Sequence, residues 1–498
     1  MLIPIAIDSA IVVELIVVSS VLITILTVGH ALYNGFFHPL RSYPGPLSHL
    51  MTIIPRALYQ FRGCLPFHVA DLHRRYGPVV RIAPNELAFC SPQAWRDIYG
   101  TKPGQEEFPK YEAFYRVFRH IPVSIGNADY FEHARLRRHL SPGFGARAMR
   151  AQEPIIGSYV DLLVSRLREA VQTESLQNML EWYTWTTFDI IGDLSFGVEG
   201  GFGCLRNNNY HPWVILIKDF MRQNGKIGAL ASLGLRSLLA RLHKHAAHRI
   251  ADGQHRRIVQ EKVSQRLNSG ARPDFLDSLI RNKESLNLDL GRLSTNASSL
   301  IVAGSETTAT LLCGVTYLLT INTEILHRVQ REVRSAFKNS EEITLMSVSN
   351  LHYMLACLNE TLRYYPPVPT GFPRQTHRSA VIDGKFVPQG TVVSVFQYAI
   401  NYDEHYWKEP DKFIPERWMG DPRYKGDQFD AMQPFSVGPR NCIGRNLAYA
   451  EMRLILAKLL YNFDLTLADE SRNWLEGQKA WAVWDKPALG IRLHPLNP

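Results

Sequence analysis

The first apolar segment of the chain is long enough to form a membrane-spanning helix. Residues 11–32 are apolar apart from Glu14 and His30. These 22 residues span roughly 33 Å as a helix, enough to cross a bilayer. A cleaved secretory signal is the less favoured alternative, because Asp8 and Glu14 stand where such a signal is basic. The first basic residue, Arg41, follows the segment, so the positive-inside rule predicts a single-pass anchor with the remaining chain in the cytosol.

A turn-forming stretch separates this segment from the rest of the chain. Tyr43-Pro44-Gly45-Pro46 cannot continue a helix. Between Pro66 and Leu493 we find no repeat and no Gly/Ser-rich or charged linker that would divide the body. We therefore expect an anchor over residues 1–35, a hinge over 36–60 and one large domain over 61–498.

The body has mainly helical periodicity. Short alternating runs predict strands at 79–82, at 86–89 and between 381 and 395, where Asp383-Gly384 and Gln389-Gly390 supply turns. Six longer segments have apolar residues at helical spacing: 154–170, 176–194, 293–319, 325–337, 348–364 and 447–461. These patterns predict a mainly α fold with small β-sheets.

Composition narrows the function by exclusion. The formal charge of +9 is spread along the chain without a basic run, which favours a membrane surface or an acidic partner over nucleic acid. The six cysteines contain no CxxC pair, so neither a disulfide scaffold nor a zinc site is indicated. There is no GxGxxG after a strand and no GxxxxGK[ST], so any reducing electrons are expected from another protein.

Two segments contain candidate chemistry. Cys442 lies in a loop with two glycines and a proline just before a predicted helix, where backbone N–H groups and the helix dipole stabilise a thiolate. Taken alone, such a cysteine is more often structural than catalytic. In the apolar helix 293–319, Gly304 leaves room for a ligand, and Glu306 and Thr307 can supply protons. The alternative is a threonine bonded to its own helix and a glutamate in a buried ion pair.

Four motifs together resemble one family. Phe435 to Gly444 matches FxxGxRxCxG, the haem-binding loop of the cytochrome P450 family, at every fixed position. Residues 303–308, AGSETT, resemble its [AG]Gx[DE]T[TS] signature. Residues 360–363, ETLR, resemble its ExxR, and residues 415–418, PERW, resemble its PER[FW]. The motifs follow the family's order, and the resemblance covers nearly the whole chain.

The resemblance implies a fold, a cofactor and site residues. The fold would be the family's mostly helical prism with small sheets around haem b, behind an N-terminal transmembrane helix. Cys442 would be the axial ligand of the iron, whose thiolate favours cleavage of the O–O bond of dioxygen. Thr307 would deliver protons, with Glu306 as the acid of the pair. The loop residues Arg440 and Phe435 would bind a haem propionate and pack on the cysteine side of the ring. Glu360, Arg363 and Arg417 would form a buried triad supporting the cysteine loop.

Further propionate ligands are implied less directly. By itself the run from His133 to Arg138 is typical of a solvated basic helix face. The family's WxxxR motif falls here with His133 where tryptophan is common, so Arg137 is the clearer ligand. Arg374, after Pro373, matches a further propionate contact. Residues 375–379 lack the proline and glycine that are common in related fungal enzymes.

Two short segments resemble those of filamentous-fungal microsomal members of the family. They are residues 37–40, FHPL, and 132–135, EHAR. They imply a monooxygenase in the endoplasmic reticulum membrane, facing the cytosol, that hydroxylates or epoxidises a hydrophobic terpenoid, polyketide or alkaloid in secondary metabolism. Electrons would come from NADPH–cytochrome P450 reductase, with cytochrome b5 as a further donor.

Two alternatives remain open. One is an isomerase or dehydratase of the same fold that uses no reductase, although such relatives tend to lose the pair Glu306-Thr307. The other is a haem-binding sensor without turnover. By family analogy the substrate pocket would draw on Phe114 to Phe118, Trp213 to Met221, Leu300 to Ala303, Thr370 to Phe372 and Trp481 to Trp484. We expect a bulky, hydrophobic substrate.

Overall fold

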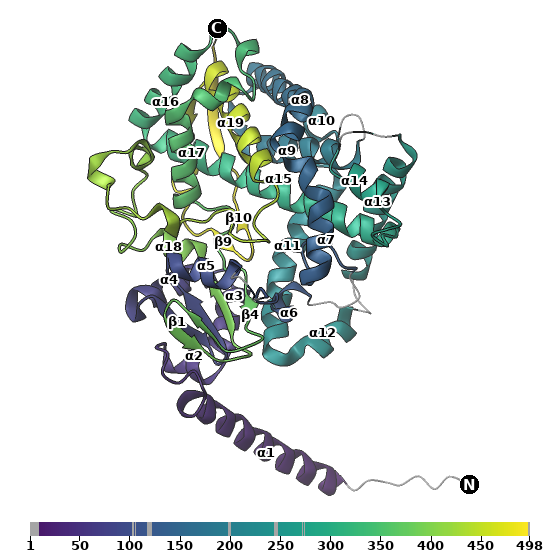
Figure 1. The fold of residues 1–498 in the computed structure, drawn as a ribbon, viewed down its shortest axis with the longest axis vertical. Helices are drawn as coiled ribbons and strands as arrows, with labels where there is room; N and C mark the ends of the chain where they lie inside the picture. Colours follow the sequence, from purple (N-terminus) through teal and green to yellow (C-terminus); the bar gives the residue numbers. More distant parts are fainter. Residues whose placement is uncertain are drawn as a thin grey trace.

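A computed structural model describes residues 9–101, 104, 106–116, 122–197, 201–243, 248–270, 272 and 274–496. Figure 1 shows a mainly helical body from which a single long helix projects. The helices are α1 (Ser9–Phe36), α2 (Leu47–Met51), α3 (Ile54–Phe61), α4 (Leu65–Tyr76), α5 (Pro92–Tyr99), α6 (Glu112–Tyr115), α7 (Tyr130–Leu140), α8 (Ala146–Thr173), α9 (Met179–Phe196), α10 (Cys204–Asn207), α11 (Pro212–Leu230), α12 (Arg236–His243), α13 (His248–Asn268), α14 (Asp277–Arg281), α15 (Leu290–Ile321), α16 (Thr323–Ala336), α17 (His352–Tyr364), α18 (Gln397–Asn401) and α19 (Arg445–Asn462).

Small sheets complete the body. The largest has the strand order β1 (Val79–Ala83), β2 (Glu86–Phe89), β7 (Val392–Val395), β4 (Arg374–Gln375), in which β2 and β7 are parallel and the other pairs antiparallel. The three-stranded sheet is antiparallel, in the order β3 (Leu176–Asn178), β11 (Gly490–Pro495), β8 (Phe463–Leu467). Two antiparallel hairpins are β5 (Ala380–Ile382) with β6 (Lys385–Val387), and β9 (Lys479–Ala480) with β10 (Trp484–Asp485).

The projecting helix α1 is a candidate membrane span. Its residues Val13–Phe36 are apolar and none of its most apolar stretch is buried. Its last turn is nevertheless docked on the body: Asn34 donates to the carbonyl of Met51 at 3.2 Å and accepts from Arg81 at 3.0 Å. The segment expected to be a hinge contains α2 and α3, so the connection has regular structure of its own.

The helix α15 is the centre of the body. It also passes the length and hydropathy test for a membrane span, but 72% of its apolar stretch is buried, as expected for a core helix. Asp289 caps its first turn by accepting from the N–H of Arg292. It contacts α9, α13, α17 and α19, and Figure 1 shows it running through the middle of the molecule.

Two element predictions need correction. The segment 176–194 begins with the strand β3 because its first residues pair with β11, and the helix α9 starts only at Met179. The helix α8 begins at Ala146, eight residues before the predicted start at Pro154, which lies inside it. The mainly helical fold with small sheets was predicted correctly.

Candidate active site

The loop that carries Cys442 is held tightly by its own backbone. The N–H of Cys442 donates to the carbonyl of Phe435 at 2.8 Å and closes the loop. Ser436 and Gly438 have left-handed backbone angles, with φ of 58° and 76°. A Cβ on Gly438 would lie 2.0 Å from the carbonyl oxygen of Tyr99 at the end of α5, so only glycine fits here.

The thiol of Cys442 is accessible although protein surrounds it. It is exposed, whereas four of the other five cysteines are buried and Cys64 is partly buried. Burial raises the pKa of the Cys442 thiol, while the backbone N–H of Gly444 and the cations Arg137 and Arg445 act in the opposite direction. Three residues further on, the helix α19 begins. A reachable sulfur at a helix start is a competent metal ligand.

Beside the loop lie four basic residues, Arg440, Arg374, Lys110 and His133, which form the cation group. Arg440 pairs with Glu107 at 2.5 Å. Arg374, on β4, is buried, and its Nε has no acceptor among the described residues. Burial, then Arg440 and Arg374, lower the pKa of Lys110 to about 7. Burial, then neighbouring cations led by Arg440, lower the pKa of His133 to about 3, so its imidazole is neutral.

This arrangement fits a dianionic ligand. One carboxylate, that of Glu107, balances Arg440, while Arg374 Nε remains a buried donor without an acceptor. A buried donor and depressed cation pKa values are costly unless an anion is bound. The two propionates of haem would meet both requirements, and Cys442 would hold the iron.

Arg137 holds the cysteine loop. It donates to the backbone oxygen of Asn441 and, at 2.6 Å, to its side-chain oxygen. Its expected contact with a propionate stays a prediction. Lys110, which the sequence analysis did not single out, lies beside Arg374, because its backbone forms a bridge with that residue. No motif marks Lys110, and only the pairing of two distant segments could have found it.

Helix α15 presents its polar residues in different directions. Thr307 is half-buried beside exposed Ala303, and its hydroxyl donates to the Ala303 carbonyl at 2.7 Å. Glu306 is buried and forms an ion pair with Lys486. These are the two contacts that the sequence analysis gave as the alternative to proton delivery: a threonine bonded to its own helix and a glutamate in a buried ion pair.

Gly304 lies against α9. A Cβ at this position would lie 2.7 Å from Cδ1 of Ile191 on α9. The space beside Gly304 is therefore filled by α9. The hydrogen of Gly304 allows α15 and α9 to approach closely on this side, and the expectation that the glycine leaves room for a ligand stays a prediction.

A second carboxyl lies against α15 from α19. Glu451 is buried, and within the described part of the chain neither of its carboxyl oxygens has a hydrogen-bond partner. Burial raises its pKa to about 8, and the nearby hydroxyl of Thr308 offsets this only in part. Glu451 is therefore mainly a neutral acid at pH 7.

We expect Glu451→Gln to flatten the pH dependence of stability. The folded protein keeps the Glu451 proton up to about pH 8, whereas an ordinary glutamate loses it near 4.5. The folded state holds more protons between these values, so wild-type stability falls as pH rises through this window. The variant should lose this slope, which is up to about 1.4 kcal/mol per pH unit. Thermal unfolding of both proteins at several pH values tests this, and equal slopes would contradict it.

The residues Glu360, Arg363 and Arg417 meet in the core. Arg363 contacts the Glu360 carboxylate at 2.8 and 3.0 Å, and Arg417 contacts it at 3.1 Å. All three side chains are fully buried. Two further partners were not foreseen: Trp418 donates to Glu360 at 2.8 Å, and Asp427 pairs with Arg417.

Of the residues expected to line the substrate pocket, some are exposed and others are buried. Ala303 and Phe372 are exposed, and Phe114 is half-buried, as a lining requires. Trp213 and Trp484 are wrong as lining residues because both are buried by neighbouring aromatic rings. Residues 117 and 118, also expected there, lie outside the described residues.

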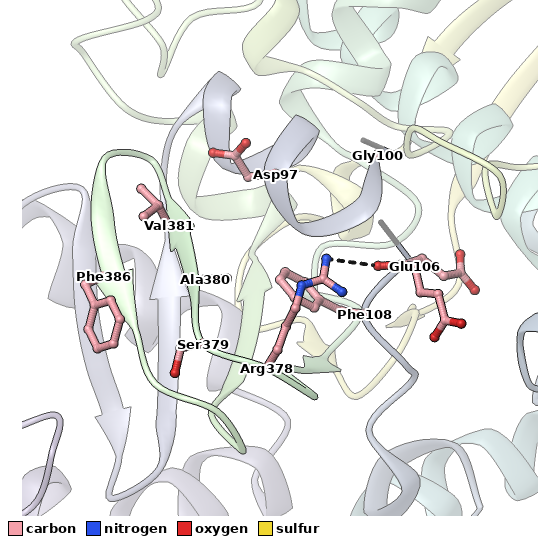
Figure 2. Close-up of a pocket in the computed structure, with 10 residues that line it drawn as sticks. Asp97, Gly100, Glu106, Phe108, Arg378, Ser379, Ala380, Val381 and Phe386 are labelled. Atoms are coloured by element: carbon pink, nitrogen blue, oxygen red, sulfur yellow. Dashed lines mark hydrogen bonds between the residues drawn. The ribbon is translucent and has the colours of Figure 1, made fainter. Parts of the chain in front are cut away.

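Glu107 also faces an outer hollow of about 350 Å³ between α5 and the hairpin β5–β6. Figure 2 shows the Arg378 side chain across this hollow; its guanidinium donates to the Glu106 carbonyl at 3.3 Å. Asp97, on α5, and Phe386, on β6, also line this hollow. Because Glu107 lines this hollow and pairs with Arg440, it forms the wall between the outer surface and the cation group.

An accessible cysteine in a glycine-containing loop, beside a group of buried basic residues, fits a haem-thiolate protein. The sequence profile of the cytochrome P450 family matches residues 44–488, so the chain belongs to this family. The cytochrome P450 monooxygenase tpeC of Talaromyces stipitatus is 49% identical over 94% of this chain and 92% of its own length. The trichothecene C-15 hydroxylase of Fusarium sporotrichioides is 42% identical over 93% of this chain and 94% of its own.

A third relative, the cytochrome P450 monooxygenase prhB of Penicillium brasilianum, is 42% identical over 93% of this chain and 95% of its own. The expected family, fold, haem cofactor and monooxygenase class are thereby confirmed. The isomerase and the non-catalytic sensor are not favoured.

Proposed function

We propose that this monooxygenase hydroxylates a bulky, hydrophobic secondary metabolite at a membrane surface. The observation that carries the proposal is the accessible sulfur of Cys442 beside basic residues that include the buried Arg374, whose Nε has no acceptor among the described residues. Two relatives are named for hydroxylation of trichothecenes, at C-15 and at C-4, which supports hydroxylation over epoxidation. The open residues Ala303, Phe114 and Phe372 give the substrate an apolar surface.

Each residue of the site has a proposed task. Cys442 ligates the iron, and bound haem with a thiolate ligand supplies the activation of dioxygen. Arg440, Arg374 and Lys110 hold the propionates, and the neutral imidazole of His133 adds a donor. Arg137 fixes the cysteine loop through Asn441. Phe435 packs on the cysteine side of the ring, and Glu360, Arg363 and Arg417 keep the segments behind the loop in register.

Protons reach the oxygen site through α15. Thr307 lies on the open face of the helix, and rotation of its hydroxyl away from the Ala303 carbonyl makes that hydroxyl a donor. Glu306 is the acid that restores its proton. Gly304 keeps α15 close to α9, so that Thr307 stays at a fixed depth.

The electron donor docks on the cysteine side. A hollow of about 570 Å³ there is lined by Arg150, Arg445, Arg453 and the exposed Met346. Arg445 is the first residue of α19, close behind Cys442. A basic surface of this kind attracts an acidic protein. The proposed partners are NADPH–cytochrome P450 reductase and, as a second donor, cytochrome b5.

Reversing charge in this hollow should slow electron delivery without removing haem. For Arg453→Glu we expect the rate of reductase-driven NADPH oxidation to fall about tenfold at low salt, with the difference shrinking as salt screens the charges. The carbon-monoxide spectrum should not change. Arg75→Glu, on the exposed end of α4, is the matched control. An equal effect of both variants would count against docking at this hollow.

The membrane is the proposed location. The helix α1 anchors the protein, and exposed apolar residues on α2 and α3, namely Leu47, Ile54, Leu58 and Phe61, extend the apolar surface beyond it. We propose a single-pass anchor in the endoplasmic reticulum with the body in the cytosol.

Incubation with reductase, NADPH, ¹⁸O₂ and a panel of fungal terpenoids and polyketides tests the function. We expect a product that carries one ¹⁸O atom and consumption of NADPH. A product that is an isomer of its substrate, formed without NADPH, would instead establish the isomerase alternative.

A further inference from the structure

Lys486 is a buried cation that reaches α15 from the segment after β10. Its side chain is 3% exposed, and that of Glu306, its partner, is 7% exposed. The ammonium also donates to the Thr310 hydroxyl at 2.8 Å and to the Trp484 carbonyl at 3.4 Å. Each of its three donors therefore has an acceptor, and one acceptor is the acid proposed for proton delivery.

The contact fixes the direction in which Glu306 points. Glu306 and Thr310 are one helical turn apart, so they share the face of α15 that Lys486 covers. Thr307 lies on another face, beside exposed Ala303. The acid and the hydroxyl of the pair are thus adjacent in sequence but face different surroundings.

The energetics make Lys486 decisive for the acid. Among the described residues, Lys486 is the cation that pairs with Glu306. Breaking a buried ion pair is far more disruptive than breaking an exposed one, and this pair is almost fully enclosed. Lys486 is therefore placed to govern the position of Glu306.

We propose that Lys486 is a positioning residue for proton delivery: it holds the Glu306 carboxylate on the buried face of α15 and so sets how readily the acid serves Thr307. The inference rests on the proposed function, because it requires Glu306 and Thr307 to supply protons. Lys486 acts through Glu306 and contacts neither cofactor nor substrate.

The test uses dioxygen as the probe. The haem-loaded full chain is incubated with reductase, NADPH and dioxygen, without an organic substrate. The quantity measured is the hydrogen peroxide released per NADPH consumed, at neutral and alkaline pH. We expect Lys486→Met to raise the share of hydrogen peroxide severalfold and to change its pH profile, because a Glu306 side chain that Lys486 no longer holds in place serves Thr307 less well. Lys486→Arg should stay close to wild type.

A matched control separates positioning from general destabilisation. Lys458 on α19 is a buried lysine paired with Asp161 on α8, and its ion pair includes neither Glu306 nor Thr310. Lys458→Met should lower thermal stability but leave the hydrogen peroxide share unchanged. If Lys486→Met behaves in the same way, Lys486 only docks the C-terminal hairpin and the proposal is overturned, while the proposed function stands.

A double variant keeps the test sound even where Lys486→Met folds poorly. Glu306→Gln with Lys486→Met leaves no stranded charge, so we expect its thermal unfolding temperature to exceed that of Lys486→Met alone. Its hydrogen peroxide share should equal that of Glu306→Gln alone, since the lysine acts through the acid. If Glu306→Gln itself leaves the share unchanged, the proton role of Glu306 fails and the positioning role with it. Haem ligation by Cys442 is read separately from the carbon-monoxide spectrum.

Discussion

Cys442→Ser will remove the strongly red-shifted Soret band of the dithionite-reduced, carbon-monoxide-bound protein and will abolish monooxygenase activity. The thiolate donates electron density to the iron, and a serine hydroxyl cannot replace it. The absorption spectrum of the two purified proteins measures the effect directly. We expect activity to fall by at least about a thousandfold, equivalent to roughly 4 kcal/mol of transition-state stabilisation.

The matched control for this prediction is Cys64→Ser. Cys64 is partly buried at the start of α4, and it lies in none of the family's motifs. Its replacement should leave the spectrum intact. A red-shifted band that survives in Cys442→Ser would identify another ligand and refute the assignment of this cysteine.

Arg417→Met will sharply reduce the yield and thermal stability of the haem-loaded protein. The change leaves the buried carboxylate of Asp427 without its cation and removes one of the cations on Glu360. Breaking a buried ion pair in this way costs roughly 3–5 kcal/mol. Thermal unfolding, together with the ratio of haem to protein after purification, measures the loss.

An arginine of the same region provides the comparison. Arg423 pairs with Asp421 at 2.7 Å, but its side chain is 67% exposed. Arg423→Met should change stability far less than Arg417→Met does, because exposed ion pairs contribute little. Equal losses in both variants would show that the buried pairs contribute nothing particular to the fold.

The features predicted best from sequence are those encoded in contiguous residues. The loop around Cys442 and the pair Glu306-Thr307 are marked by their own neighbours. The long apolar helix 293–319 was also identified within a few residues of α15, because a buried helix has a long apolar run. By contrast, α13 consists mostly of polar residues, so no apolar stripe marked it.

The features that were missed depend on contacts between distant segments. Lys486 lies 180 residues from Glu306, and nothing near it in the sequence indicates a buried partner. Lys110 joins the cation group through a strand bridge to Arg374. The contact between Gly304 and Ile191 could not be predicted for the same reason, since Ile191 comes from α9.

The contact between Gly304 and Ile191 also guides any effort to alter the range of compounds that this enzyme accepts. A side chain introduced at position 304 would press on Ile191, which would have to shift within the core. Ala303, one residue earlier, is exposed and is one of the residues expected to line the substrate pocket. A mutant library should therefore vary position 303 and keep glycine at 304, so that changed selectivity is obtained in proteins that still assemble.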